Sequence, residues 1–161
     1  PGFLPIGGRT LVRQTSSTHG PDGYIATDPA VIAEMLARMQ RKIESAVDRF
    51  AFIDHRPAHG ADTLVVSYGV TARAAGAAAG RLTRSGRPVS SLALKTLWPV
   101  PEKAIRRAAD GIRRVLVVEM NLGQYVHEIS RVLPGVEIGF VGQMDGRLIT
   151  PDRITEALIH G

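Results

Sequence analysis

The sequence contains no cysteine, and this absence excludes several kinds of site at once. Disulfide bonds, thiolate metal sites, iron–sulfur clusters and cysteine nucleophiles all need that side chain, so none of them can be built from this chain. The glycine-rich loops that bind phosphate are also missing, because no G-x-G-x-x-G opens a helix and no G-x-x-x-x-G-K-[ST] occurs. Without a G-x-S-x-G nucleophile elbow, a serine hydrolase triad has no basis either.

Lysine and aromatic residues are scarce. Of the 20 basic residues 17 are arginine, the formal net charge is +5 and the sequence pI is 10.2. The arginines are spread along the chain with acidic residues between them, whereas a nucleic-acid groove needs a basic stripe with aromatic residues between the charges. A solvated arginine-rich surface is therefore favoured over nucleic-acid binding, which would show as steeply salt-dependent retention on DNA.

Long hydrophobic runs are absent. The most apolar helical segment, 71–82, contains Arg73 and Arg81 and is far shorter than the ~20 residues that span a bilayer. No signal peptide is visible, so we expect a cytoplasmic protein without membrane contact. The 161 residues, 44% hydrophobic, suit one compact domain, and the start at Pro1 leads us to expect a piece of a longer protein.

The amino-terminal part of the chain reads as a connector and a helix. Residues up to Thr27 carry repeated glycine and proline with little periodicity. Asp28 and Pro29 then provide a capping side chain and a proline at the first helical position. Apolar residues follow at three- and four-residue spacing, which predicts an amphipathic helix over 29–47. We expect a connector over 1–27, a linking helix over 28–48 and a globular domain over 49–161.

The remainder alternates between strand and helix patterns. A short alternating segment, 50–56, has polar ends and is closed by Pro57, which predicts an edge strand. Continuous apolar runs then alternate with helical patterns, as is typical of parallel strands covered on both faces. The residues therefore predict an α/β fold with three layers. Further strands are expected to begin at Leu64 and to cover 89–97, 115–118 and 136–141, with helices over 71–83, 101–109, 122–133 and 151–159.

Gly76 and Gly80 lie on one face of the helix expected over 71–83. Each glycine costs about 1 kcal/mol of helix propensity, which only close packing would offset. We therefore expect the backbone of a sheet or a neighbouring helix against this face, in preference to a ligand.

The histidines offer few candidates for a site. His55 and His59 have a four-residue spacing with Asp54 beside them, but Pro57 between them argues against the helix that this spacing requires. We therefore expect no metal site and no catalytic residue in this chain. His127 is interpreted as a surface or interface histidine.

Two strand ends carry unusual polar residues, in the runs Ser67-Tyr68-Gly69 and Glu119-Met120-Asn121. In an open parallel sheet, ligands and partners bind at the carboxyl ends of the strands, where the strand order reverses. We expect Asn121 to cap the next helix and Gly123 to permit a tight turn, which makes this helix start a mild anion site. The candidate crevice or interface residues are Tyr68, Gly69, Glu119, Asn121, Gly123 and Gln124.

Three interpretations of this crevice are open. Glu119, Asn121 and Gln124 could form a structural polar cluster that ties the strand to the helix, which is the favoured interpretation. They could also bind a ligand directly or contact another subunit.

Several runs of residues together resemble the C-terminal part of the alpha subunit of the 2-oxoacid:ferredoxin oxidoreductases, the enzymes for 2-oxoglutarate, branched-chain 2-oxoacids and pyruvate. They extend from about His19 to the end of the chain, in the family's order. Each run alone is weak, but the combination is specific. The matching runs are His19, Asp22-Gly23 and Thr27-Asp28-Pro29, then ADTLVVSYG from Ala61, LWPVP from Leu97, VEMNLGQ from Val118 and GRLITP from Gly146.

The resemblance implies a fold like the C-terminal domain of transketolase. Its five-stranded mixed sheet has the order 1-3-2-4-5, and its first strand is antiparallel. The segment 50–56 would be this first strand. The order would place the strand from Leu64 beside the strand 115–118, so that Tyr68 and Asn121 share one crevice.

The resemblance also implies a function. The parent enzymes decarboxylate a 2-oxoacid on thiamine diphosphate with Mg²⁺, reduce ferredoxin through iron–sulfur clusters and form an acyl-CoA. This chain lacks the G-D-G…N diphosphate motif and has no cysteine for a cluster, so it should bind none of these cofactors and be inactive alone. Its expected partners are the other domains and the thiamine-binding beta subunit, which it would pack against and orient, and a homodimer is also open.

The rival hypothesis is a stand-alone α/β module that binds a phosphate or nucleotide at the helix start over Asn121–Gln124. Titration calorimetry with CoA, thiamine diphosphate and nucleotides would distinguish the two, because micromolar binding favours the module.

Overall fold

The computed structural model describes residues 5–13, 15 and 17–160, and the chain packs as two compact units, Pro1–Val47 and Asp48–Gly161. Residues 1–4, 14 and 16 of the expected connector, and residue 161, lie outside the described residues. In chain order the elements are α1 (Pro29–Glu44), α2 (Val47–Phe50), β1 (Ile53–Arg56), β2 (Thr63–Tyr68), α3 (Thr71–Arg84), β3 (Ser90–Leu94), α4 (Glu102–Ala108), β4 (Arg114–Glu119), α5 (Tyr125–Val132), β5 (Glu137–Gly142) and α6 (Pro151–His160).

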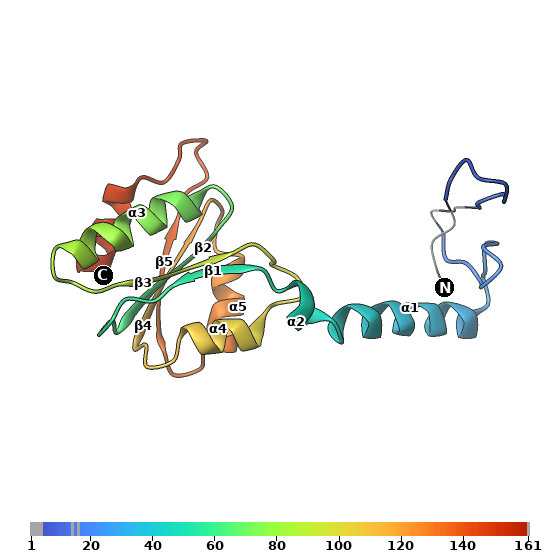
Figure 1. The fold of residues 1–161 in the computed structure, drawn as a ribbon, viewed down its shortest axis with the longest axis horizontal. Coiled ribbons are helices and arrows are strands. Elements are labelled where there is room, and N and C mark those ends of the chain that lie inside the picture. The colour runs from blue at the N-terminus through green and yellow to red at the C-terminus, as the bar shows by residue number, and fades with distance from the viewer. Residues whose placement is uncertain (1–4, 14, 16, 161) are drawn as a thin grey trace. The chain divides into compact units, whose positions relative to one another are not determined.

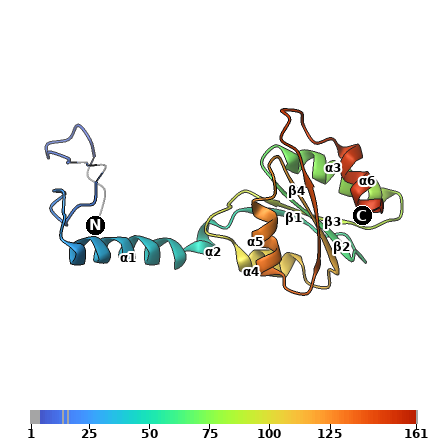
Figure 2. The ribbon, with the colours of Figure 1, turned by 180° about the vertical axis from the view of Figure 1, so that it is seen from behind.

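The second unit is built on a five-stranded sheet with the order β1-β3-β2-β4-β5 (Figure 1). Strand β1 pairs antiparallel with β3, and all other neighbours are parallel. Helices α3 and α6 lie against one face and α4 and α5 against the other (Figures 1 and 2). The α/β class predicted from the residues is confirmed, and so are the strand order and the antiparallel first strand that the resemblance implies.

The sheet separates two hydrophobic clusters, because successive strand side chains point to opposite faces. Leu92 and Ile129 belong to the cluster under α4 and α5, and Leu116 and Ile154 to the cluster under α3 and α6. All four side chains are buried. Cover on both faces explains why the central strands read as continuous apolar runs.

The edge strand is shorter than the predicted segment 50–56. Phe50 closes helix α2, and β1 begins only at Ile53. The Phe52 N–H donates to the Phe50 carbonyl at 2.9 Å, and the Thr96 hydroxyl donates to the same carbonyl. The chain therefore turns before the strand starts, and the alternation of apolar residues at 50–52 belongs to this turn.

In the first unit, helix α1 starts where the sequence predicts. Asp28 Oδ1 accepts hydrogen bonds from the N–H groups of Ala30 at 2.7 Å and Val31 at 3.3 Å, which confirms the capping role. The helix ends at Glu44, three residues before the predicted end, and the Ser45 N–H donates back to the last turn. No described residue of α1 is buried, so its apolar stripe remains at least partly exposed.

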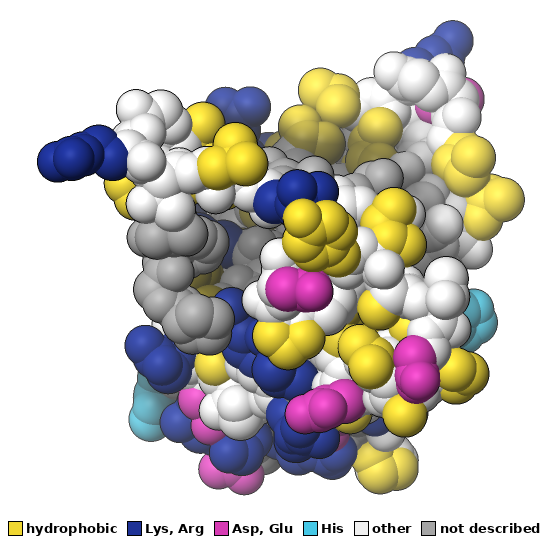
Figure 3. All heavy atoms as spheres, turned by 90° about the vertical axis from the view of Figure 1, so that its right-hand side faces the viewer, with side chains coloured by type: hydrophobic (Ala, Val, Ile, Leu, Met, Phe, Trp, Pro, Cys, Tyr) yellow, Lys and Arg dark blue, Asp and Glu magenta, His cyan; other side chains and the backbone are white. Residues whose placement is uncertain are grey.

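Much of the arginine charge is paired with nearby acidic groups. Arg131, for example, contacts both Glu102 at 2.8 Å and Glu128 at 2.9 Å. On the face seen in Figure 3, basic side chains are interspersed with acidic and hydrophobic ones. Within the described residues, no helix combines the length and the apolar character needed to cross a bilayer.

The two glycines of α3 do not serve the predicted close packing. A Cβ atom at Gly76 would meet no atom within 4 Å apart from its own helical backbone, and one at Gly80 would meet only the Arg84 guanidinium at 3.4 Å. The prediction that an element of this chain packs closely on these glycines is therefore wrong. Alanines and a leucine pack on the sheet instead, namely Ala75, Ala78, Ala79 and Leu82.

Among the glycines that the structure describes, Gly142, at the end of β5, has the tightest surroundings. A Cβ atom there would lie 2.7 Å from the Asn121 carbonyl oxygen and would also overlap the ring of Phe140. We predict that Gly142→Ala lowers the free energy of unfolding by about 1–3 kcal/mol, because backbone must shift to admit the methyl group. Gly76→Ala is the matched control and should raise it by about 0.5–1 kcal/mol. Urea unfolding measures both, and equal effects of the two substitutions would contradict the prediction.

Candidate functional site

The candidate site lies where the order of the sheet reverses, between the neighbouring strands β2 and β4. The crossover after β2 runs through α3 on one face, and the crossover after β4 runs through α5 on the other. Tyr68 ends β2, and Asn121 follows β4. Asn121 Nδ2 donates to the Tyr68 hydroxyl at 2.6 Å, so the two strand ends share one site.

Glu119 is the centre of this site, and its side chain is 0% exposed. Its Oε2 atom accepts hydrogen bonds from the Tyr68 hydroxyl at 2.8 Å and from Asn121 Nδ2 at 3.0 Å. The backbone N–H of Tyr125 donates to the same oxygen at 2.9 Å, and that of Val126 donates to Oε1 at 2.8 Å. A buried carboxylate needs such partners, because leaving it unpaired would cost several kcal/mol.

The cap of helix α5 is Glu119 and not Asn121. The helix begins at Tyr125, three residues after the predicted start at 122, and its first N–H groups are bound by the Glu119 carboxylate. Asn121 instead stabilises the turn that precedes the helix, because its Oδ1 accepts hydrogen bonds from the N–H groups of Gly123 at 2.8 Å and Gln124 at 3.1 Å. Glu119 reaches α5 from the preceding strand, so it lies outside the local capping patterns that a sequence reveals.

Gly123 has the predicted turn role and Gly69 has a similar backbone conformation, but Gln124 lies apart from the cluster. Gly123 has a φ of +96°, and a Cβ atom there would lie 3.2 Å from Val126. Gly69 has a φ of +57° directly after β2. The left-handed conformation favours glycine at both positions. The Gln124 side chain is exposed and points to no member of the cluster within hydrogen-bond distance.

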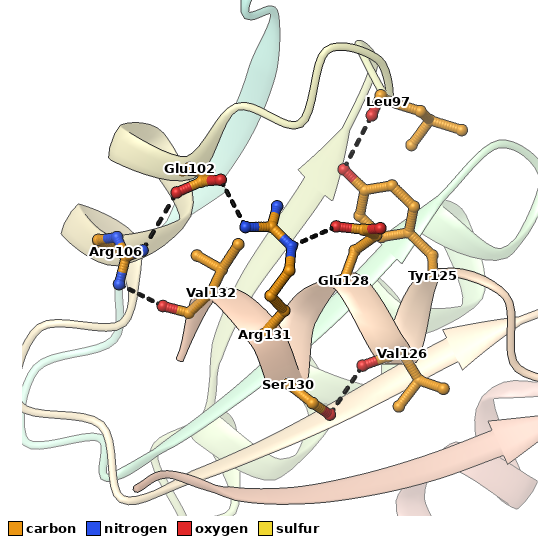
Figure 4. Close-up of polar contacts among 9 residues, drawn as sticks. All are labelled: Leu97, Glu102, Arg106, Tyr125, Val126, Glu128, Ser130, Arg131 and Val132. Carbon is orange, nitrogen blue, oxygen red and sulfur yellow. Dashed lines mark hydrogen bonds and ion pairs between the residues drawn. The ribbon is translucent and has the colours of Figure 1, made fainter. Parts of the chain in front are cut away.

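Helix α5 is fixed along its whole length against its neighbours. The Tyr68 and Tyr125 rings pack edge to face with centroids 5.6 Å apart, and the Tyr125 hydroxyl donates to the Leu97 carbonyl at 3.1 Å. At the other end, the Arg106 guanidinium donates to the Val132 carbonyl (Figure 4). Glu102 on α4 accepts from Arg106 and also pairs with α5 through Arg131 (Figure 4).

The tyrosines of the site hold their protons more tightly than free tyrosine. Burial raises the pKa of Tyr68 to about 12, and the hydrogen bond and negative charge of Glu119 act in the same direction, while Asn121 opposes them. Burial also raises the pKa of Tyr125, with a smaller contribution from the charge of Glu128. Tyr68 is therefore a neutral hydrogen-bond donor at physiological pH.

The start of α5 has few donors to offer an anion. The N–H groups of Gly123 and Gln124 are bound by Asn121, and those of Tyr125 and Val126 by Glu119. A second anion at this place would also be repelled by the Glu119 carboxylate. The structure therefore disfavours the anion site predicted here and favours the structural polar cluster.

The histidines form no centre with the acidic residues. In the described part of the chain, no three His, Asp or Glu side chains lie close enough to hold a metal ion together. His59, in the loop between β1 and β2, and His127, on α5, are both exposed. His55 lies on β1 with Nε2 buried and without a hydrogen-bond partner.

Exposed hydrophobic side chains gather around the site, a feature that the sequence analysis missed. The carboxyl ends of β2 to β5 and the amino end of the antiparallel β1 lie at the same edge of the sheet. Trp98 and Leu122, in loops at this edge, are 72% and 81% exposed. The carboxyl-edge surface, as we name it, comprises the exposed side chains of Phe52, Val70, Trp98, Leu122, Met144 and Leu148.

A local signal for this surface exists in the sequence. Its members stand in the loops that flank the strands, Phe52 directly before β1 and the others within six residues after a strand, where polar turn residues are usual. Val70 and Leu148 also line one pocket of about 370 Å³ together with Met120, so parts of the surface are hollowed.

We predict that Glu119→Gln lowers the free energy of unfolding by about 3 kcal/mol. The amide keeps the size of the side chain but places an N–H₂ group against one of four donors and removes the charge at the start of α5. Glu102→Gln is the matched control, since Glu102 makes ion pairs at the surface and should change stability by only about 0–1 kcal/mol. Urea unfolding compares them, and a Glu119→Gln effect as small as that of the control would contradict the role of Glu119.

The raised pKa of Tyr68 predicts a loss of stability at alkaline pH. The folded state binds the phenol proton more tightly than the unfolded state, whose tyrosine pKa is about 10. This contribution is complete below about pH 10 and is lost as the pH rises through about 12, and Tyr125 acts in the same direction. Unfolding free energies across this range should fall less steeply for Tyr68→Phe than for the unchanged chain. Equal slopes, or a Tyr68 phenol that ionises near pH 10 by ultraviolet absorbance, would contradict this prediction.

Comparison with known proteins identifies relatives that match most of this chain. Residues 61–154 match the family described as pyruvate:ferredoxin oxidoreductase core domain II. The chain is 33% identical over 147 residues to the 2-oxoglutarate synthase subunit KorA of Methanothermobacter marburgensis, covering 90% of this chain and 39% of the relative. It is also 33% identical to the subunit of that name from Archaeoglobus fulgidus, over 94% of this chain and 41% of the relative. The chain thus spans about two fifths of the length of these curated relatives.

Solved structures agree with this assignment. The 2-oxoglutarate:ferredoxin oxidoreductase of Magnetococcus marinus, solved with 2-oxoglutarate, coenzyme A and succinyl-CoA, matches 96% of this chain and 27% of its own, with 25% identity and a TM-score of 0.78. A split-gene transketolase in an inactive beta4 tetramer shares the fold, with 19% identity, a TM-score of 0.56, and coverage of 66% of this chain and 40% of its own. The chain matches the transketolase-like C-terminal domain of the alpha subunit of 2-oxoacid:ferredoxin oxidoreductases. It therefore belongs to the pyruvate:ferredoxin oxidoreductase core domain II family.

Proposed function

We propose that this chain is a non-catalytic domain of the alpha subunit of a cytoplasmic, thiamine-diphosphate-dependent 2-oxoacid:ferredoxin oxidoreductase. The parent enzyme would convert a 2-oxoacid to an acyl-CoA and reduce ferredoxin. The domain would pack against the thiamine-binding beta subunit and orient the active-site domains. Relatives that are 2-oxoglutarate synthase subunits support this proposal.

The observation that carries the proposed role is the carboxyl-edge surface. Exposed apolar groups that gather at one edge of a soluble domain are typical of a protein interface, because burial stabilises by roughly 25 cal/mol per Å². The opposite edge carries turns with charged residues such as Asp110, Arg113 and Arg87. Beneath the carboxyl-edge surface, the Glu119 cluster fixes the strand ends and α5, so the surface would be presented by a rigid base.

The residues of this chain do not fit the cofactors of the parent enzyme. No cysteine is available for an iron–sulfur cluster. The amides at the start of α5 are bound by Asn121 and Glu119, which leaves no cradle there for the diphosphate of thiamine diphosphate or the phosphates of CoA. Thiamine diphosphate, Mg²⁺, the clusters and CoA would accordingly be held by other domains and subunits, and the isolated chain would be inactive.

We predict that charged substitutions on the carboxyl-edge surface weaken assembly. In co-expression with the thiamine-binding subunit of the same enzyme, the unchanged chain should co-purify with it, and Trp98→Glu with Leu122→Glu should weaken the complex by about 2 kcal/mol or more, roughly thirtyfold in Kd. Ile159→Glu is the matched control, because Ile159 is a partly exposed apolar residue of α6 whose neighbours line the opposite edge. Interferometry measures the affinities, and circular dichroism confirms that each variant is folded.

Two results would contradict the proposed function. One is co-purification that the double substitution leaves unchanged while Ile159→Glu weakens it. The other is micromolar binding of CoA, thiamine diphosphate or a nucleotide to the isolated chain in calorimetry, which would favour the stand-alone binding module. Dimerisation of the isolated chain that Trp98→Glu abolishes would assign this surface to a second copy instead.

A further inference from the structure

A groove of about 710 Å³ lies between helix α3 and the edge of the sheet formed by β1 and β3. Its floor includes the small side chains of Ser91 and Ala93 from β3. Its wall includes Ala72, Gly76 and Ala77 from α3. Because these side chains are small, a segment of polypeptide that enters the groove could approach the backbones of both β3 and α3 closely.

The groove exists because the helical layer is incomplete on this side of the sheet. On the opposite side, β1 and β3 are covered, since Ile53, Leu92 and Leu94 pack into the core under α4 and α5. On the groove side, α3 packs on β2 and β3 and α6 lies farther along, against α3 and β4. Within the second unit, the outer part of β3 and the edge strand β1 therefore have no helix above them on this side.

Gly76 is an independent sign that something from outside the chain fits here. Glycine is the poorest helix former after proline, so its place in the middle of α3 needs a use. Among the described residues it has no packing partner, because a Cβ atom at Gly76 would point into open space. Where helices pack closely, such small residues let two backbones approach each other.

The charge of the groove indicates the chemistry of its occupant. Arg73 on α3 and Lys95 beyond β3 line opposite sides of it. Among the described residues, no carboxylate lies within 4.0 Å of either of them. Arg56, farther along the floor, is paired with Asp54 at 2.9 Å. The groove lining thus carries three cations, Arg56, Arg73 and Lys95, against the one carboxylate of Asp54, and presents a net positive charge to its occupant.

We propose that this groove binds an acidic helix of another polypeptide, which completes the helical layer over β1 and β3. The helix would place small residues against Gly76 and Ala93, and its flanking Asp or Glu side chains would pair with Arg73 and Lys95. A small anion is the less suitable occupant, because the groove is open and small-molecule sites enclose most of their ligand. The groove reaches the carboxyl edge of the sheet, where Tyr68, Gly69 and Leu97 line it. None of the six residues of the carboxyl-edge surface lines the groove, so this proposal does not rest on that surface.

The test uses the full 161-residue chain and a designed probe. The probe is a fluorescent peptide constrained as a helix, with alanine along one face and glutamate on both flanks, and its control peptide carries lysine at every glutamate position. Fluorescence anisotropy at low salt should show saturable binding of the acidic peptide, with a Kd of the order of 10–100 μM, and none of the control. Arg73→Gln with Lys95→Gln, and separately Gly76→Leu, should each weaken binding about tenfold or more.

Matched variants test whether the peptide binds in this groove. Arg87→Gln removes an exposed arginine that lies outside the groove and should leave binding unchanged, as should the uncharged substitution Leu122→Gln on the carboxyl-edge surface. The proposal is overturned if the acidic peptide does not saturate, if both peptides bind equally, or if Gly76→Leu, folded by circular dichroism, binds as well as the unchanged chain. Binding of inorganic phosphate at micromolar concentration, reduced by Arg73→Gln with Lys95→Gln, would assign the groove to a small anion and also overturn it.

Discussion

The carboxylate of Glu119 is completely buried, and donors from the end of β2, the loop after β4 and the first turn of α5 hold it. A carboxylate in this position is stable only while its donors stay in place, since an unpaired buried charge is far costlier than the pair is favourable. The interaction therefore couples three segments: if α5 moves, Glu119 loses two donors, and if β2 shifts against β4, it loses Tyr68. Strand register and helix position are specified together.

This coupling determines what the edge of the sheet can do. The polar side chains at the reversal of the strand order form hydrogen bonds with one another, and Tyr68, whose pKa burial raises to about 12, donates to Glu119 as a neutral phenol. The side chains free to interact are the apolar ones around the cluster, of which Trp98 and Leu122 are the most exposed. A rigid polar base beneath an exposed apolar rim suits the proposed role in subunit contact.

The sequence was most informative where the cause of structure is local. Alternation and apolar runs were sufficient for the α/β class, and Asp28 before Pro29 marked the start of α1. The strand order came from the family resemblance, because nothing local decides which strands pair. The role of Glu119 as the cap of α5 could not be predicted, since it depends on a strand residue that reaches a helix six residues later. For Gly76 the prediction from sequence was wrong. Two glycines on one helix face predicted close packing, but the space beside Gly76 is open, because the helices of the second unit do not cover this side of β1 and β3.

The most direct test of the central claim is amide hydrogen exchange at Tyr125 and Val126, measured by NMR. N–H groups at the start of a helix have no partner within the helix and normally exchange fast. If the Glu119 carboxylate binds them as described, both should exchange as slowly as the amides of the buried strand β4, and Glu119→Gln should release them while β4 stays protected. Fast exchange of these two amides in the unchanged chain would contradict the account.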